Sequence, residues 1–80
     1  YNEYIMTSLR TSWGCDVEHI FNVFGEKYSV FFNKSIQPYL KNGQLVQNEN
    51  RFILTESAKL FADGIAADLF VWKLWISLLF

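Results

Sequence analysis

Apolar residues near the start of the chain recur at three- and four-residue steps, the spacing of one face of a helix. They predict a helix over about residues 3–12, with Asn2 as its N-cap and Gly14 at its end. Its apolar face comprises Ile5, Met6, Leu9 and Trp13. A second helix is expected between Asp16, a suitable cap, and Gly25. Its core face comprises Val17, Ile20, Phe21 and Phe24, with His19 on the opposite side.

A third helical pattern runs from about residue 26 or 28 to residue 42, where Gly43 ends it. Its buried face comprises Tyr28, Phe32, Ile36, Tyr39 and Leu40. Pro38 lies within this pattern, lacks an amide proton and clashes with the preceding turn. We therefore expect either a kink at Pro38 or two shorter helices.

Residues 44–54 have a different pattern, with two short apolar runs around a polar centre. The runs are Leu45-Val46 and Phe52-Ile53-Leu54, and the centre is Gln47-Asn48-Glu49-Asn50-Arg51. Asn-rich residues between two such runs favour a small β-hairpin, with strands so short that they must pack on the helices.

A last helix is predicted from Thr55, an N-cap followed by Glu56 in the first turn, to Phe70. Its apolar face comprises Ala58, Phe61, Ala62, Ile65, Ala66 and Leu69. We expect a domain over residues 1–70 and an apolar tail over residues 71–80, which continues this helix because Trp72 and Ile76 extend its face. The tail is too short for a membrane span, which takes about 20 apolar residues. It can add to the core, dock on another surface or mediate self-association.

The predicted order is three helices, a hairpin and a long last helix. This order indicates a mainly α domain with a short β-hairpin, similar to a winged helix. Apolar residues make up 51% of the 80 residues and aromatic residues 19%, so the chain can bury a core and still present aromatic surface to a partner. The chain begins at Tyr1 and has its only methionine at position 6, so we expect a piece of a longer protein.

Charge and cysteine content narrow the function classes. The net charge is −1 and the basic residues are scattered, which argues against nucleic-acid binding. Lys27, Lys34 and Lys41, with Gln37 and Arg51, nevertheless leave open a free-standing winged-helix nucleic-acid-binding or protein-interaction module, although a solvated helix face is the simpler interpretation. A single cysteine, Cys15, excludes an intramolecular disulfide within the 80 residues and fits a reducing, cytoplasmic setting.

The sequence holds no complete active site. Cys15 and His19 are four residues apart, but Cys15 precedes the expected cap and two ligands make a weak metal or haem-iron site. The carboxylates Glu3, Glu18, Asp63 and Asp68 are interpreted as surface charge, since nothing places two of them in one apolar pocket. We therefore assign no catalytic residue, metal site or cofactor to these residues, and expect no enzyme activity from them alone.

A set of short motifs in a fixed order resembles a known family. The motifs are Asn2-Glu3-Tyr4-Ile5-Met6, Leu9-Arg10, Gly14, Asp16, Phe24-Gly25, Gly43 with Leu45-Val46, and Leu54-Thr55 leading to Ala62-Asp63-Gly64-Ile65. Over residues 1 to about 70 they are similar to the C-terminal domain of the oxygen-independent coproporphyrinogen III oxidase family, radical S-adenosylmethionine (SAM) proteins with a haem-chaperone-like branch. Ala58 departs from the family pattern, which usually has glycine there, and the tail from Val71 has no counterpart.

The resemblance implies an upstream barrel in the same polypeptide, which holds a [4Fe–4S] cluster through three cysteines and binds SAM. That three-cysteine motif is absent from this sequence. The oxidase branch decarboxylates two propionates of coproporphyrinogen III, whereas the chaperone-like branch binds haem. The domain would pack beside the barrel and cover or shape the porphyrin site. Asn2, Glu3 and Arg10 are the candidate contacts to the barrel or to a porphyrin carboxylate, with helix capping and surface ion pairing as the alternative.

Overall fold

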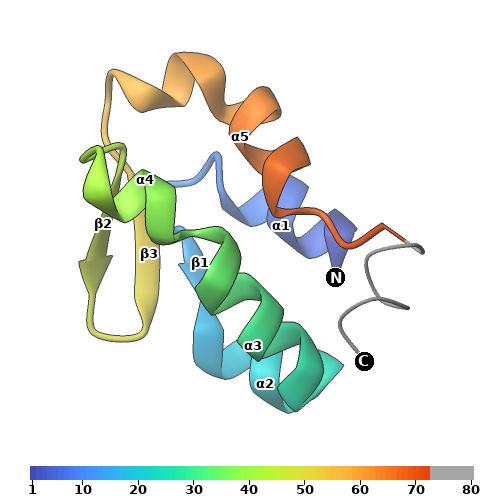
Figure 1. Cartoon of the computed structure of the whole chain (residues 1–80). Coiled ribbons are helices and arrows are strands. Elements are labelled where there is room, and N and C mark those ends of the chain that lie inside the picture. The colour runs from blue at the N-terminus through green and yellow to red at the C-terminus, as the bar shows by residue number, and fades with distance from the viewer. Residues whose placement is uncertain (73–80) are drawn as a thin grey trace.

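The computed structural model describes residues 1–72, and they form short helices around a small antiparallel sheet (Figure 1). The helices are α1 (Asn2–Ser8), α2 (Val17–Phe24), α3 (Glu26–Ser35), α4 (Gln37–Lys41), the 3₁₀ helix η1 (Ala58–Phe61) and α5 (Ala62–Leu69). The strands are β1 (Cys15–Asp16), β2 (Leu45–Asn48) and β3 (Arg51–Leu54). The expected class, mainly helical with a β-hairpin, is confirmed.

The elements pack as two helical pairs beside the sheet. In Figure 1, α2 and α3 lie against each other at the bottom, and α1 lies against α5 above them. The strands stand to one side of both pairs. The first residue lies near the end of α5, so the two ends of the described chain come together.

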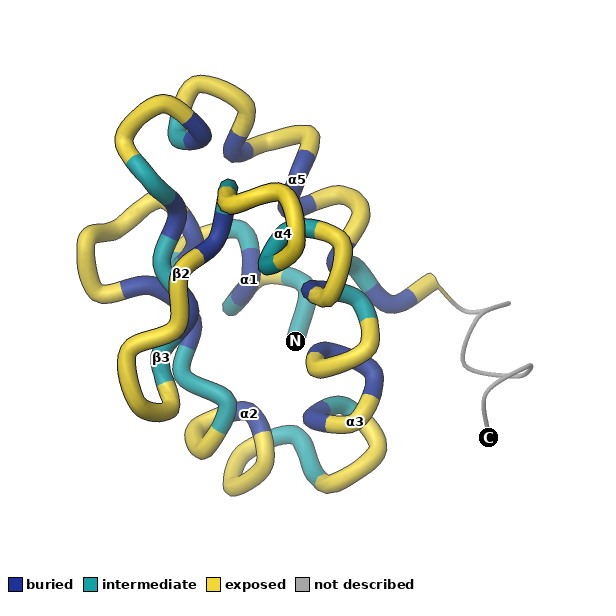
Figure 2. The backbone as a smooth tube through the Cα atoms, turned by 60° about the vertical axis from the view of Figure 1, so that its left-hand side comes forward, coloured by how far each residue is buried: buried dark blue, intermediate teal, exposed yellow. Residues whose placement is uncertain are grey.

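Side chains from every layer meet in one core. Figure 2 shows the buried positions of the tube turned towards its interior. The largest fully buried side chains are Phe32, Ile5, Leu9, Ile20, Ile36, Leu45 and Leu69. The rings of Phe32 and Phe52 meet edge to face with centroids 5.5 Å apart, which joins α3 to the sheet. Three predicted core residues are wrong, because Trp13, Phe21 and Phe61 are each more than half exposed.

The sheet has the order β1-β3-β2, with β3 in the centre. The hairpin is confirmed: Leu45 pairs with Leu54 and Asn48 with Arg51. The strand β1 was not predicted; it pairs Cys15 with Phe52 and places the residues before α2 against β3.

Both expected boundaries of α2 are confirmed. The Asp16 carboxylate accepts the backbone N–H groups of Glu18 and His19 at 2.8 and 3.3 Å, and thus caps the helix. Gly25 ends it with a φ of 103°. The division of the third helix is confirmed as well, since α3 ends at Ser35 and Pro38 lies in the first turn of α4.

The first helix differs from the expectation at both ends. Tyr1, not Asn2, is the N-cap residue of α1, and Asn2 lies within the helix. The helix ends at Ser8 instead of about residue 12. Residues 9–12, predicted as the end of this helix, form a turn that Thr11 holds together. Thr11 donates its N–H and its Oγ1–H to the carbonyl of Ser8, and its Oγ1 accepts the N–H of Gly14.

The last helix is shorter than predicted. Thr55 is not a side-chain cap, a turn follows it, and α5 begins only at Ala62 after η1. α5 ends at Leu69, and Phe70 is extended with φ −69° and ψ 149°, so the predicted helix does not include residues 70–72. The reason is that Tyr1 and Asn2 bond the backbone of Leu69 and Val71 and hold this segment extended. The rest of the predicted extension, residues 73–80, lies outside the described residues.

Candidate functional site

The first two residues and the end of α5 form a hydrogen-bonded junction. The Asn2 amide donates to the Val71 carbonyl at 3.0 Å and accepts the Val71 N–H at 2.7 Å. The Tyr1 hydroxyl donates to the Leu69 carbonyl at 3.0 Å. Burial raises the pKa of the Tyr1 hydroxyl well above its usual range, so it remains a donor.

Glu3 lies at the same junction. With Asn2 it lines a hollow of about 300 Å³, which is completed by Tyr1, Tyr28 and Val71. The carboxylate of Glu3 is exposed and accessible to a partner. The structure therefore brings two of the three predicted contact residues together, although both polar atoms of the Asn2 amide are already bonded to Val71.

Arg10, the third predicted contact residue, lies beyond the end of α1. Its guanidinium forms an ion pair with Asp63 of α5 and contacts the Met6 sulfur at 3.7 Å. The side chains of Arg10 and Asp63 are 55% and 75% exposed, so the pair is weak in water and the guanidinium remains accessible. Both residues belong to motifs that the sequence analysis singled out, Leu9-Arg10 and Ala62-Asp63, but nothing in the sequence links the two positions 53 residues apart.

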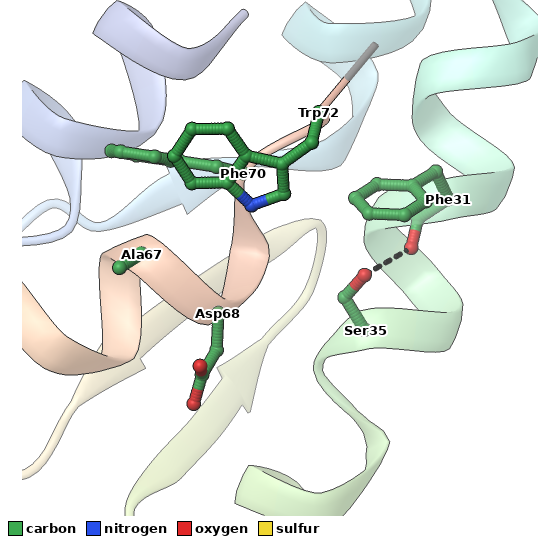
Figure 3. Close-up of a pocket in the computed structure, with 6 residues that line it drawn as sticks. All are labelled: Phe31, Ser35, Ala67, Asp68, Phe70 and Trp72. Carbon is green, nitrogen blue, oxygen red and sulfur yellow. Dashed lines mark hydrogen bonds between the residues drawn. The ribbon is translucent and has the colours of Figure 1, made fainter. Parts of the chain in front are cut away.

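A second hollow, of about 270 Å³, lies between α3 and the end of α5 (Figure 3). Its lining comprises Phe31, Ser35, Ala67, Asp68, Phe70 and Trp72. This hollow was not expected from the sequence, because the predicted helix continued through Phe70 and Trp72 and Asp68 was interpreted as surface charge. The chain leaves α5 at Leu69 instead, and this change of direction sets both aromatic residues beside the hollow.

Asp68 is bonded on the side of the hollow that faces α4. It accepts a hydrogen bond from the Tyr39 hydroxyl. Burial, together with the Asp68 hydrogen bond and charge, raises the pKa of Tyr39 to about 12. Tyr39 therefore stays protonated at neutral pH and donates its hydroxyl proton to the Asp68 carboxylate.

Cys15 and His19 do not form a paired site. Cys15 is fully buried, with its sulfur 3.1 Å from the Ser8 hydroxyl, and burial raises the pKa of the thiol to about 11. His19 is exposed and stacks on Tyr4 with ring centroids 4.6 Å apart. Residues 1–72 contain no group of three or more His, Cys, Asp and Glu side chains that could hold a metal ion.

The lysines of the third predicted helix lie on two helices. Lys27 and Lys34 belong to α3, whereas Lys41 ends α4, beyond the break at Ile36. Arg51 stacks its guanidinium over the ring of Trp13, 4.3 Å from the centroid. None of the helices formed by residues 1–72 has the length and apolar character needed to cross a bilayer.

Several large apolar side chains are exposed. Within residues 1–72, the most exposed is Leu60 of η1, at 85%, followed by Trp13 at 67% and Phe61 at 62%. Leu60 and Phe61 are neighbours on η1, which connects β3 to α5. The segment between β3 and α5 lies at the top of the molecule in Figure 1. Exposed apolar side chains of this size next to each other are typical of interaction surfaces.

A comparison with protein families identifies the domain. The family model described as the HemN C-terminal domain matches residues 1–61. No curated protein matches the chain. No solved structure matches it either. The match covers three quarters of the sequence, from α1 through η1. The chain therefore belongs to the family of HemN C-terminal domains, the C-terminal domains of the HemN-type, oxygen-independent coproporphyrinogen III oxidase family of radical SAM proteins.

Proposed function

We propose that residues 1–70 are an accessory domain that packs on a radical SAM barrel of the same polypeptide and covers or shapes its porphyrin site. The family match is the observation that carries this proposal. The parent protein would be an oxygen-independent coproporphyrinogen III oxidase or the related haem chaperone, in the cytoplasm. Its barrel would supply a [4Fe–4S] cluster and SAM, which generate the radical chemistry.

The exposed apolar side chains support packing against another domain. Leu60 and Phe61 lie next to each other on η1, which is the end of the region matched by the family. Burying a leucine or phenylalanine side chain stabilises a contact by about 1.5–3 kcal/mol. We therefore propose that η1 lies in the interface with the barrel.

The polar residues near α1 would orient this contact. Glu3 and Arg10 both expose their charged groups, and a guanidinium can bind a carboxylate through two hydrogen bonds. We propose that Arg10 binds a carboxylate of the barrel or of the porphyrin. This carboxylate either replaces Asp63 as the partner of Arg10 or binds Arg10 together with Asp63. Asn2 takes part by holding the junction, since its amide is bonded to Val71.

The experiment compares two apolar-to-acidic changes in a full-length protein that carries this domain. Leu60→Asp is expected to lower porphyrin turnover or porphyrin binding, because it places a charge in the proposed interface. Val23→Asp is the matched control, because Val23 is 59% exposed on α2, away from η1. The isolated 80-residue chain with either change should keep its thermal midpoint, which separates a lost interface from misfolding.

Arg10→Ala tests the polar contact in the same protein. We expect weaker porphyrin or haem binding, with Asp63→Ala as the control for loss of the Arg10–Asp63 pair alone. If Leu60→Asp and Val23→Asp behave alike, η1 is not in the interface. If Arg10→Ala leaves the affinity unchanged, Arg10 does not bind a carboxylate of the barrel or the ligand.

A further inference from the structure

The hollow between α3 and the end of α5 has an aromatic wall. Phe31 of α3 and the pair Phe70 and Trp72, which follows α5, border it (Figure 3). The Phe70 and Trp72 rings are 5.7 Å apart between centroids and tilted by 59°. The face of an aromatic ring carries partial negative charge and attracts cations, most strongly in the case of tryptophan.

The polar groups of this hollow are mostly acceptors. Ser35 donates its hydroxyl proton to the Phe31 carbonyl at 2.8 Å, so its oxygen presents lone pairs. Asp68 adds a carboxylate, and among residues 1–72 it forms no ion pair with a lysine or arginine. Its hydrogen bond comes from Tyr39, which is neutral and leaves the charge uncompensated. Among the side chains of this lining, the indole N–H of Trp72 is the hydrogen-bond donor that faces no partner within the lining.

The volume of this hollow and the chemistry of its side chains limit the kinds of ligand that it can bind. A hollow of about 270 Å³ suits a small group, since ligand pockets start near about 300 Å³. One carboxylate among aromatic rings is a poor site for Mg²⁺ or Ca²⁺, which require several oxygen ligands. An anion would face Asp68 and the ring faces and be repelled.

We propose that this hollow binds an organic ammonium group, with its aromatic rings around the cation and Asp68 as the counter-charge. This binding site is independent of the role proposed for η1 and Arg10, and neither tests the other. Such a group is found on free small amines and on lysine side chains, and Lys73 follows the last residue of the lining directly in the sequence.

The experiment titrates the 80-residue chain with choline and follows the Trp72 indole N–H by nuclear magnetic resonance. The neutral probe is 3,3-dimethylbutan-1-ol, which has the same shape without the charge. We expect saturable shifts with choline and an affinity for the neutral alcohol weaker by about five-fold or more, since each cation–ring contact at an exposed site contributes about 0.5–1 kcal/mol.

Two pairs of variants locate the site. Asp68→Asn should weaken choline binding by about two- to five-fold and leave the alcohol unaffected, because only the attraction between charges is lost. Asp63→Asn, the same change elsewhere on α5, should have no effect. Trp72→Leu removes the indole, so this variant is followed through the backbone amides of Ser35 and Asp68. It should abolish their saturable shifts, whereas Trp13→Leu, another exposed tryptophan, should not.

A further variant, Lys73→Met, distinguishes the two sources of the ammonium group. Tighter choline binding in this variant would mean that the lysine of the chain itself competes for the hollow, and unchanged binding that the ligand comes from outside. Either result supports an ammonium site. Equal affinity for choline and the neutral alcohol, no effect of Asp68→Asn, or no shift of the Trp72 indole would overturn the proposal.

Discussion

At the scale of single residues, Gly14 shows how one missing side chain permits the sheet. Its φ is +78°, a conformation that favours glycine. A methyl group at this position would overlap the Phe52 carbonyl oxygen and lie 2.8 Å from Ile53 Cγ1. Gly14 therefore allows the chain to approach β3 closely enough for Cys15 to pair with Phe52.

Gly14→Ala should destabilise the domain by about 2 kcal/mol or more, since it adds a backbone overlap to the strain of a left-handed alanine. In a domain of this size, a loss of about 1 kcal/mol lowers the thermal midpoint by about 4–8 °C. Gly43→Ala is the matched control, because Gly43 has a φ of +80° but open space around it. It should cost only the backbone strain, about 1 kcal/mol. Equal shifts in the two melting curves would contradict this account of Gly14.

At the scale of elements, α5 depends on its neighbours. It has eight residues, and a helix of this length is not stable alone in water. Ile65 and Leu69 anchor it in the core, Arg10 pairs with Asp63, and Tyr39 of α4 donates to Asp68. The pKa of Tyr39, raised to about 12, shows that the folded state favours the protonated phenol.

The Tyr39–Asp68 contact should give stability a defined pH dependence. Because the folded pKa of Tyr39 lies above the usual value near 10, its contribution is fully present below about pH 10 and is lost as the pH rises towards 12. We expect the free energy of unfolding of the wild type to exceed that of Tyr39→Phe at pH 8, and the difference to shrink above pH 10. Urea unfolding of both proteins from pH 8 to 11.5 measures it. Other tyrosines cancel in the comparison, and a difference that stays constant would rule out this contribution.

Elements with local signals were predictable from the sequence. Asp16 and Gly25 mark the ends of α2, Pro38 divides α3 from α4, and the Asn-rich turn marks the hairpin. In contrast, β1 has two residues and exists only because β3 offers them partners. The end of α5 depends on the bonds of Tyr1 and Asn2 to residues 69–71, and a helical pattern in one segment carries no information about such distant partners.

The candidate sites also divide into one that local sequence signals predicted and one that depends on residues distant in the sequence. The sequence selected Asn2 and Glu3, which are adjacent in a helix, and the structure places them at one junction. It did not predict the hollow beside Trp72, because that site exists only where the chain leaves α5 and turns towards α3. Phe31 was also left out of the predicted core face, although it is only 9% exposed.

At the scale of the whole molecule, the junction between residues 1–2 and 69–71 closes the fold. The side-chain amide of Asn2 and the backbone of Val71, 69 positions apart in the sequence, are joined by two hydrogen bonds. These bonds keep α1 aligned with α5, and side chains of both helices complete the core.

Asn2→Ala should weaken this closure without dismantling the sheet. Two partly buried hydrogen bonds contribute about 1–3 kcal/mol together, and their loss should release the Val71 N–H to solvent. Hydrogen exchange should therefore accelerate at Val71 more than at the paired amides of β3. Glu3→Ala, on the neighbouring exposed position, is the control and should leave exchange at Val71 unchanged. Protection at Val71 that survives in Asn2→Ala would show that the junction does not need these bonds.

The closure also sets when the domain can fold during its synthesis. The apolar face of α1 is made first, but its partner α5 is translated more than fifty residues later. While the ribosome adds those residues, α2, α3 and the hairpin can already form from contacts close in sequence, whereas Ile5 and Leu9 lack the helix that completes their cover. The nascent chain therefore exposes its first helix until the last one has emerged, and any factor that protects newly made chains would act on α1.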